Sequence, residues 1–149
     1  MTGRARPEGP ASQGPASHAA ASGASLSLTR EELSRASGLS EEAVEELERF
    51  GLLSGQNVVG TVYYDQEALV VAGLAAGFRR YGLEARHLRA YRNLADREAS
   101  LFEQVVVPLL KQRNPQARAQ AADALIELTR LGTGLRSSLL ARVLRSLQS

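Results

Sequence analysis

The charged residues of this chain have the types and spacing best suited to binding nucleic acid or a protein partner. A group of arginines in the middle of the sequence is interleaved with Tyr81 and Tyr91, and such groups hold phosphates in nucleic-acid-binding proteins. The candidate nucleic-acid contacts are Arg79, Arg80, Arg86 and Arg89, together with Arg49 upstream and the neighbouring Arg92 and Arg97. The alternative is that these arginines form a solvated helix surface or pair with the acidic first half of the chain.

An acidic stretch at 41–50 offers the opposite chemistry. Glu41, Glu45 and Glu46 are candidates for docking a basic protein partner. The imbalance extends beyond this stretch, because residues 27–75 carry nine acids against three bases, a net charge of −6. Residues 76–149 carry thirteen bases against six acids, a net charge of +7. Opposite potentials favour association, so the acidic part is expected to meet the basic part of the same or another chain.

Catalytic and metal-binding signatures are missing from the sequence. There is no cysteine, and the only imidazoles are His18 and His87, whereas a zinc site needs three or four convergent ligands. We also find no glycine-rich phosphate loop and no nucleophile elbow. We therefore expect no enzyme activity, no metal and no cofactor.

The first 25 residues are rich in glycine, proline, alanine and serine and hold almost no large apolar side chain. Such a segment cannot bury enough surface to offset the entropy of ordering, so we expect 1–25 to be a disordered tail or linker. No later stretch is apolar for the roughly 18 residues that a membrane span requires. The chain is expected to be soluble and cytoplasmic, without a membrane partner.

The elements that must position the charged residues follow in a clear order. Thr29 and Glu32 form a capping box that opens a first helix, and Gly38 should end it. Ser40 caps a second helix, which closes at 50–53 and buries Ala43, Val44 and Leu47. The β-branched and aromatic residues of 54–66 then predict a short hairpin with a turn at Gly60. Asp65 caps a third helix that ends near Tyr81-Gly82.

A long helix is predicted from about Glu84. Apolar residues recur along it at spacings of three and four, which gives one stripe that so small a domain would leave in water. We expect a homodimer through this stripe, formed by Leu88, Tyr91, Ala95, Phe102, Val105 and Leu109. Pro108 should kink the helix or end it near 106–107. Asn114-Pro115 should open a further helix, and Gly132-Thr133-Gly134 should interrupt it before a last one that begins at Leu135.

The order of these elements resembles the DNA-binding domain of MerR-family transcription regulators. The resemblance rests on Leu28-Thr29, Gly38-Leu39-Ser40, the run ERFGLL at 48–53, Tyr64-Asp65 and Tyr81-Gly82-Leu83. The stretch from Tyr81 to Pro115 is more narrowly similar to the second domain of actinobacterial FtsR-type regulators. The resemblance covers residues 28 to about 145. It implies a mainly α fold with a degenerate winged helix-turn-helix at 26–83, a β-hairpin wing, and a helical dimerisation or regulatory region at 84–149.

The resemblance breaks on the surface that contacts DNA in that family. Its DNA-binding members carry Arg-Tyr-Tyr where this chain has Glu45, Glu46 and Leu47, and a wing arginine where this chain has Val62. Phosphate neutralisation supplies most of the affinity for duplex DNA, so acids at these positions should repel it.

The resemblance therefore implies the dimerisation and regulatory half of a MerR-type transcription regulator. DNA would be bound through an upstream module absent from this sequence, or weakly by this chain, which we expect to be a fragment or an internally started product. The alternative is a stand-alone protein-interaction module whose acidic helix docks a basic partner such as RNA polymerase or another regulator.

Overall fold

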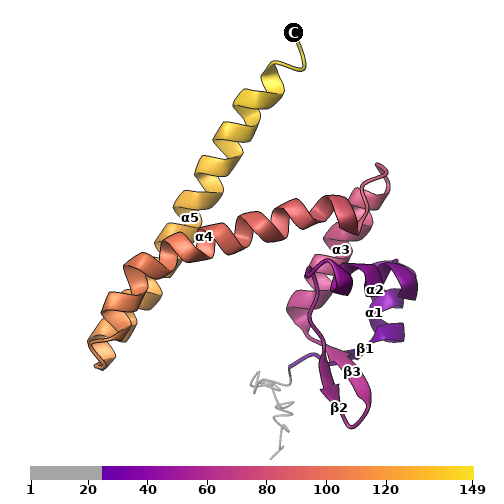
Figure 1. The fold of residues 1–149 in the computed structure, drawn as a ribbon, viewed down its shortest axis with the longest axis horizontal. Coiled ribbons are helices and arrows are strands. Elements are labelled where there is room, and N and C mark those ends of the chain that lie inside the picture. Colours follow the sequence, from indigo (N-terminus) through magenta and orange to yellow (C-terminus); the bar gives the residue numbers. More distant parts are fainter. Residues whose placement is uncertain (1–24) are drawn as a thin grey trace, which may run out of the picture.

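The computed structural model describes residues 25–149, which form five helices and three short strands in the order β1, α1, α2, β2, β3, α3, α4, α5 (Figure 1). The predicted tail at 1–25 lies outside the described residues except for Ser25. The mainly α fold with a helix-turn-helix and a small wing is confirmed.

The helix-turn-helix consists of α1, Arg30–Ser37, and α2, Glu41–Arg49. The Thr29 hydroxyl accepts the Glu32 amide at 3.2 Å, and the Glu32 carboxylate accepts the Thr29 amide at 3.1 Å, so the capping box is present. Gly38 ends α1 with φ of 81°, a left-handed conformation that glycine adopts without strain. The Ser40 hydroxyl then caps α2 by accepting the Ala43 amide. These two caps define the turn between the helices, residues 38–40.

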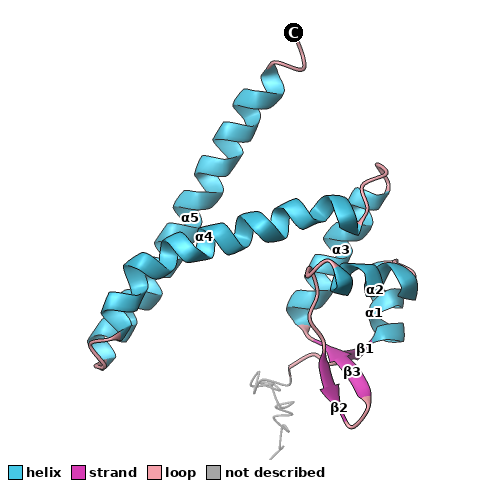
Figure 2. Ribbon diagram, viewed as in Figure 1, coloured by secondary structure: helices cyan, strands magenta, loops and turns pink. Residues whose placement is uncertain are grey.

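A three-stranded antiparallel sheet lies beside the two helices (Figure 2). The predicted hairpin is formed by β2, Gln56–Val58, and β3, Thr61–Tyr64. The third strand, β1, is Leu28–Thr29, and it pairs with β3 so that Leu28 lies opposite Tyr64. Its two residues are too few to show an alternating pattern, so the sequence did not reveal it.

The core lies between the helix-turn-helix, the sheet and α3, Gln66–Arg79. Asp65 caps α3, and the buried residues of that helix are Ala68, Ala72 and Ala75. Small side chains let α3 approach α1 closely. Large side chains from the other elements complete the core: Leu33, Leu39, Val44, Leu47, Leu53, Tyr64 and Leu88.

Two long helices complete the chain, α4 at Ala85–Leu110 and α5 at Pro115–Arg145. Figure 1 shows them crossing and then diverging, so that the end of α5 extends away from the rest of the molecule. Pro108 was predicted to kink the first of them or to end it near 106–107. It does not end the helix, which runs through Pro108 to Leu110. Among the described residues, no helix is long and apolar enough to cross a membrane.

The predicted interruption at Gly132-Thr133-Gly134 is also wrong, because α5 is one helix of 31 residues. Its N-terminus is as expected, with the Asn114 side chain accepting the Ala117 amide at 2.7 Å and Pro115 in the first turn. Packing against α4 explains why a glycine stands at 132. A Cβ added at Gly132 would lie against the Glu98 carboxylate and 3.5 Å from Cζ of Phe102, so this glycine lets the two helices approach.

Candidate functional site

The acidic surface of α2 is partly used within the fold. Arg30, on α1, places its Nη1 3.2 Å from Oε1 of Glu45 and its Nη2 3.5 Å from Oε2 of Glu48. Its Nε donates to the hydroxyl of Tyr64 at 3.3 Å, and that hydroxyl donates to Glu48. Tyr64 is buried, so this network ties α1, α2 and β3 together. Glu45 therefore has a structural partner that the sequence did not reveal.

The three candidate docking acids do not share one surface. Glu41 is exposed in the first turn of α2, one turn before Glu45. Glu46 is half-buried on another side of the helix, in a recess that it lines with Arg79, Leu83 and other residues. The structure thus separates Glu46 from the pair formed by Glu41 and Glu45.

The candidate nucleic-acid arginines lie mostly around the turn between α3 and α4. Arg79 and Arg80 are exposed at the end of α3, and Arg86 and Arg89 are exposed in the first turns of α4. Arg86 lies 3.8 Å from Glu84, whereas Arg79, Arg80 and Arg89 form no ion pair with any described residue. The structure therefore brings these four arginines to one corner of the molecule.

Arg49 and Arg92 have different surroundings. Arg49 is exposed at the end of α2 and is the only base on that helix. Arg92 is engaged within the fold, because its Nη1 donates to the Gly51 carbonyl at 2.9 Å and its Nε lies 3.0 Å from Asp96. It fixes α4 to the turn that follows α2.

The acidic half was predicted to meet the basic half of the same chain or of another chain, and ion pairs test only the first possibility. In the part of the chain that the structure describes, no ion pair joins an acid of 27–75 to a base of 76–149. The opposite charges of the two halves are therefore available to another molecule.

The predicted dimer stripe is divided by the fold. Leu88 is buried in the core beside α2, so it is not available to a partner in this conformation. Phe102 and Leu109 are half-buried on the part of α4 that packs with α5. Tyr91 and Val105 are about half exposed, Ala95 is exposed, and the Tyr91 ring lies 5.5 Å from that of Phe78. Only these last three remain open to a second chain.

The crossing of α4 and α5 was missed by sequence reasoning. Gly132 lies against Glu98 and Phe102, and Nε of Arg136 lies 3.2 Å from Oε2 of Glu98. The sequence did indicate one continuous helix. Leu128, Gly132, Leu135 and Leu139 follow one another at spacings of three and four, and this helical pattern runs through the break predicted at 132–134.

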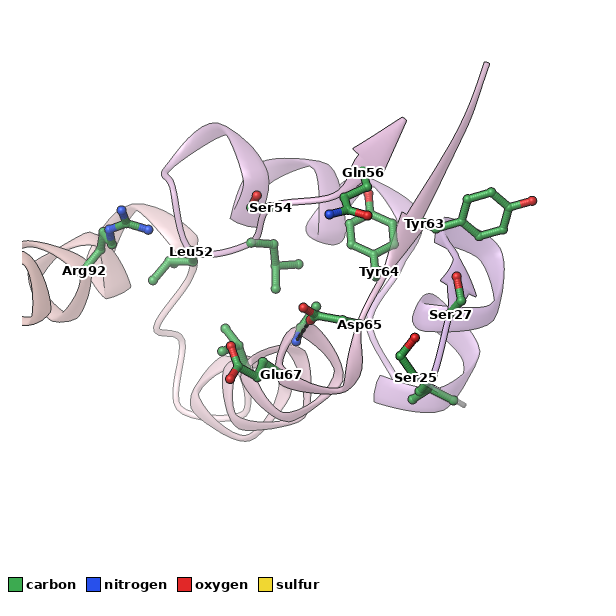
Figure 3. A pocket seen from close by; sticks show the side chains of 14 residues that line it. Ser25, Ser27, Leu52, Ser54, Gln56, Tyr63, Tyr64, Asp65, Glu67 and Arg92 are labelled. Carbon is green, nitrogen blue, oxygen red and sulfur yellow. Dashed lines mark hydrogen bonds between the residues drawn. The ribbon is translucent and has the colours of Figure 1, made fainter. Parts of the chain in front are cut away.

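A cavity of about 570 Å³ opens between the sheet, the start of α3 and α4. Figure 3 shows the labelled side chains spread around an open space, without converging on one point. Two of its charged groups have partners within the fold, since Asp65 accepts the Ala68 amide at 2.9 Å and Arg92 donates to Gly51. Across residues 25–149 no three His, Cys, Asp or Glu side chains are grouped as metal ligands would be.

A comparison with family models and a comparison with curated proteins point to the same group of relatives. Residues 26–148 match the family model described as the Rv1828-like, C-terminal domain. The chain is 34% identical over 120 residues to two proteins named uncharacterized HTH-type transcriptional regulators, Rv1828 of Mycobacterium tuberculosis and Mb1859 of Mycobacterium bovis. In each case the match covers 80% of this chain and 47% of the relative, so the chain spans about half the length of these curated relatives.

Proposed function

The chain belongs to the family of the Rv1828-like C-terminal domain, and we propose that it serves a MerR-type transcription regulator by joining two copies of that regulator. In this proposal it does not itself recognise the operator. The relatives are transcription regulators by name and are about twice as long as the matched region, which leaves room for a separate DNA-binding module. Such a regulator acts in the cytoplasm, where the chromosome lies.

The surface of α2 is the observation that carries this proposal. A recognition helix binds duplex DNA through basic and polar side chains that contact phosphates and base edges. Here α2 carries five glutamates, Glu41, Glu42, Glu45, Glu46 and Glu48, and only one base, Arg49. The single basic group of α1 that faces α2 is Arg30, and it is held by Glu45 and Glu48. This surface would repel a phosphate backbone.

The long helices α4 and α5 would form the contact between the two copies. Large apolar side chains remain exposed along α4 and α5, including Leu101 at 60%, Leu135 at 62% and Val143 at 63%. Monomeric proteins rarely leave contiguous apolar patches larger than a few hundred Å² in water, so such helices support self-association.

Titration of residues 26–149 with duplex DNA at two salt concentrations tests the proposal. We expect weak binding with little salt dependence, because few phosphates would be neutralised. An affinity that falls steeply with salt would contradict it and would implicate Arg79, Arg80 and Arg89. The variant in which these three become alanine would then lose the salt dependence, whereas Arg142→Ala serves as a control remote from that corner.

Docking of a basic partner, such as RNA polymerase or another regulator, is a second candidate function. It is favoured by Glu41 and Glu42, which are exposed at the start of α2 and form no ion pair with any described residue. Replacing both with lysine should abolish capture of that partner while the far-ultraviolet spectrum stays unchanged. Unaltered capture would remove this candidate.

A further inference from the structure

Helix α3 is apolar around its whole circumference. Its residues 68–78 include no charged or hydrogen-bonding side chain, whereas a surface helix normally has a polar outer face. Its inner side, with the buried Ala68, Ala72 and Ala75, packs against α1. A helix that is apolar all round is typical of a position covered on both sides. The outer side of α3 therefore has the composition of a covered surface.

The outer side of α3 is nevertheless open in this structure. Val70 and Leu74, one turn apart, are 53% and 63% exposed, and Tyr81, just past the end of the helix, is 85% exposed. Gly73 and Gly77 lie on the same side, because they follow Val70 at spacings of three and four. A Cβ added at either glycine would have no atom within 4 Å. These five residues form what we call the α3 outer face.

The shape of the α3 outer face suits another helix. Packed helices lie roughly 8–10 Å apart, and the side chains at the contact set the distance. Because Gly73 and Gly77 have no side chain, a second helix could approach to the lower end of this range. Val70 and Leu74 would then lie against its side. Amphipathic helices bind apolar faces in this way, through residues that recur at spacings of three and four.

The charges at one end of this face define the partner further. Figure 1 shows α3 ending at the turn that leads into α4, and the four arginines at this turn form what we call the arginine corner: Arg79, Arg80, Arg86 and Arg89. Among the described residues, only Arg86 has an acid within ion-pair distance, Glu84 at 3.8 Å. Arginine binds carboxylates through paired hydrogen bonds, so the partner should carry acids at this end.

The direction of the partner helix follows from its own dipole. Acidic residues are favoured in the first turn of a helix, where they stabilise the exposed backbone amides. The N-terminal turns of the partner would therefore lie at the arginine corner, and its apolar stripe would run back along Leu74 and Val70. The two helices would then be antiparallel.

Nucleic acid fits this surface less well than an acidic helix. A phosphate backbone would also be attracted to the arginines, but its binding would leave Val70 and Leu74 in water. Glu46 lies in a recess beside Arg79 and Leu83 and would repel phosphate there. The apolar and the basic parts of the surface are used together only by a protein.

A second copy of this chain offers no helix with the required chemistry among residues 25–149. The acidic helix is α2, but its apolar residues Ala43, Val44 and Leu47 are buried. Both α4 and α5 hold more bases than acids. The charge complementarity therefore points to a different protein.

We propose that the α3 outer face binds an amphipathic helix of another protein, a helix with acids in its first turns and an apolar stripe behind them. This binding uses neither the acidic surface of α2 nor the faces of α4 and α5 that would join two copies, so it goes beyond the proposed function. The chain would connect its regulator to a second protein through the helix-turn-helix module.

Selection from a displayed peptide library tests the chemistry of the partner. The bait is the full chain, and the library holds peptides of about 18 residues, long enough to form a helix, in which the first two turns and one stripe are varied. We expect enrichment of peptides with Asp or Glu in the first two turns and with Leu, Ile or Val along the stripe. No enrichment, or enrichment of peptides without acids, would overturn the proposal.

Binding of an enriched peptide, labelled for fluorescence anisotropy, then locates the site. Gly73→Leu should weaken binding at least about 30-fold, because the added side chain holds the partner helix away from α3. The same variant should unfold at a higher urea concentration, since leucine is the better helix former and meets no neighbouring atom at Cβ. A loss of binding could then not be attributed to a loss of the fold. Gly134→Leu, on α5, is the matched control and should leave the affinity within about threefold.

A charge exchange tests the role of the arginine corner. Replacing Arg79 and Arg80 together with glutamate should weaken binding of the peptide at least about 10-fold. A peptide whose acids are replaced with lysine should bind this double variant better than it binds the unaltered chain. Arg142→Glu is the control, because it lies near the end of α5, and should change neither affinity.

Three results would contradict the inference. Peptide binding that is unaffected by Gly73→Leu would place the partner elsewhere on the chain. Salt-dependent binding of duplex DNA that disappears when Arg79 and Arg80 become glutamate would assign the arginine corner to nucleic acid. A lower mass of the chain alone in light scattering when Gly73 becomes leucine would mean that a second copy covers α3.

Discussion

Val59 occupies the left-handed region of backbone space, with φ of 50°, at the tip of the turn between β2 and β3. It is fully exposed, so no side-chain contact compensates the strain of a β-branched residue in this conformation. Gly60 follows with φ of 83°, and its amide donates to the Asn57 side chain at 3.0 Å. Two positive φ angles in a two-residue loop are the geometry that Asn-Gly favours.

Replacing Val59 with asparagine should therefore stabilise the wing. We expect the free energy of unfolding in urea to rise by about 1 kcal/mol, because asparagine tolerates this conformation better than valine. Val58→Asn is the matched control, since Val58 lies in β2 and should gain nothing. Equal gains from the two variants would show that strain at Val59 is not the cause.

The hydrogen bonds of Tyr64 allow a second prediction about the free energy of unfolding. Its buried hydroxyl donates to Glu48 and accepts from Arg30, so Tyr64→Phe should lower the free energy of unfolding by about 1.5 kcal/mol. Tyr63→Phe removes a hydroxyl that forms no hydrogen bond with any described residue and should change stability by less than about 0.5 kcal/mol. Similar losses from both variants would argue against the network between α1, α2 and β3.

At the scale of elements, α5 shows that a glycine pair can lie within a continuous helix and that one of the two glycines serves helix packing. Glycine at 132 and 134 lowers helix propensity, and from sequence alone the pair predicted a break. The two glycines differ in the structure, because Gly132 faces Glu98 and Phe102 whereas Gly134 has no atom within 4 Å of an added Cβ. Contact with a helix some 30 residues earlier in the chain could not be inferred from the local residues.

Alanine substitution should separate these two positions. Gly134→Ala is expected to raise the free energy of unfolding by about 1 kcal/mol through helix propensity alone. Gly132→Ala should gain clearly less, because its methyl group must displace Glu98 from Arg136. Urea unfolding followed by circular dichroism measures both. A gain at 132 that matches or exceeds the gain at 134 would mean that the two long helices do not approach as described.

The elements near the N-terminus were predicted well because their signals are local. Thr29, Ser40 and Asp65 each cap the helix that follows directly in the sequence, so a few consecutive residues identify each cap. The candidate contact residues were harder to assign, since partners such as Arg30 for Glu45 lie on other elements. The burial of Leu88 was missed for the same reason, because the apolar spacing along α4 does not show which part faces the core.

At the scale of the whole molecule, a compact winged helix-turn-helix with an acidic recognition helix carries two long helices with uncovered apolar faces. The first feature disfavours DNA as the ligand of this fold, and the second favours another protein chain. Because the acidic and basic halves form no ion pairs with each other among residues 25–149, both remain available across an interface. The proposed self-association would account for the charge and the apolar faces together.

The mass of residues 26–149 in solution tests this central claim most directly. Light scattering over a range of concentrations should give twice the mass of one chain. Leu139→Asp, which charges an exposed apolar position of α5, should shift the mass to a single chain, whereas Ala141→Asp, on the opposite side of that helix, should leave it unchanged. A single-chain mass for the unaltered protein at the highest concentration would contradict the account, because the apolar faces of α4 and α5 would then be stable in water without a second copy.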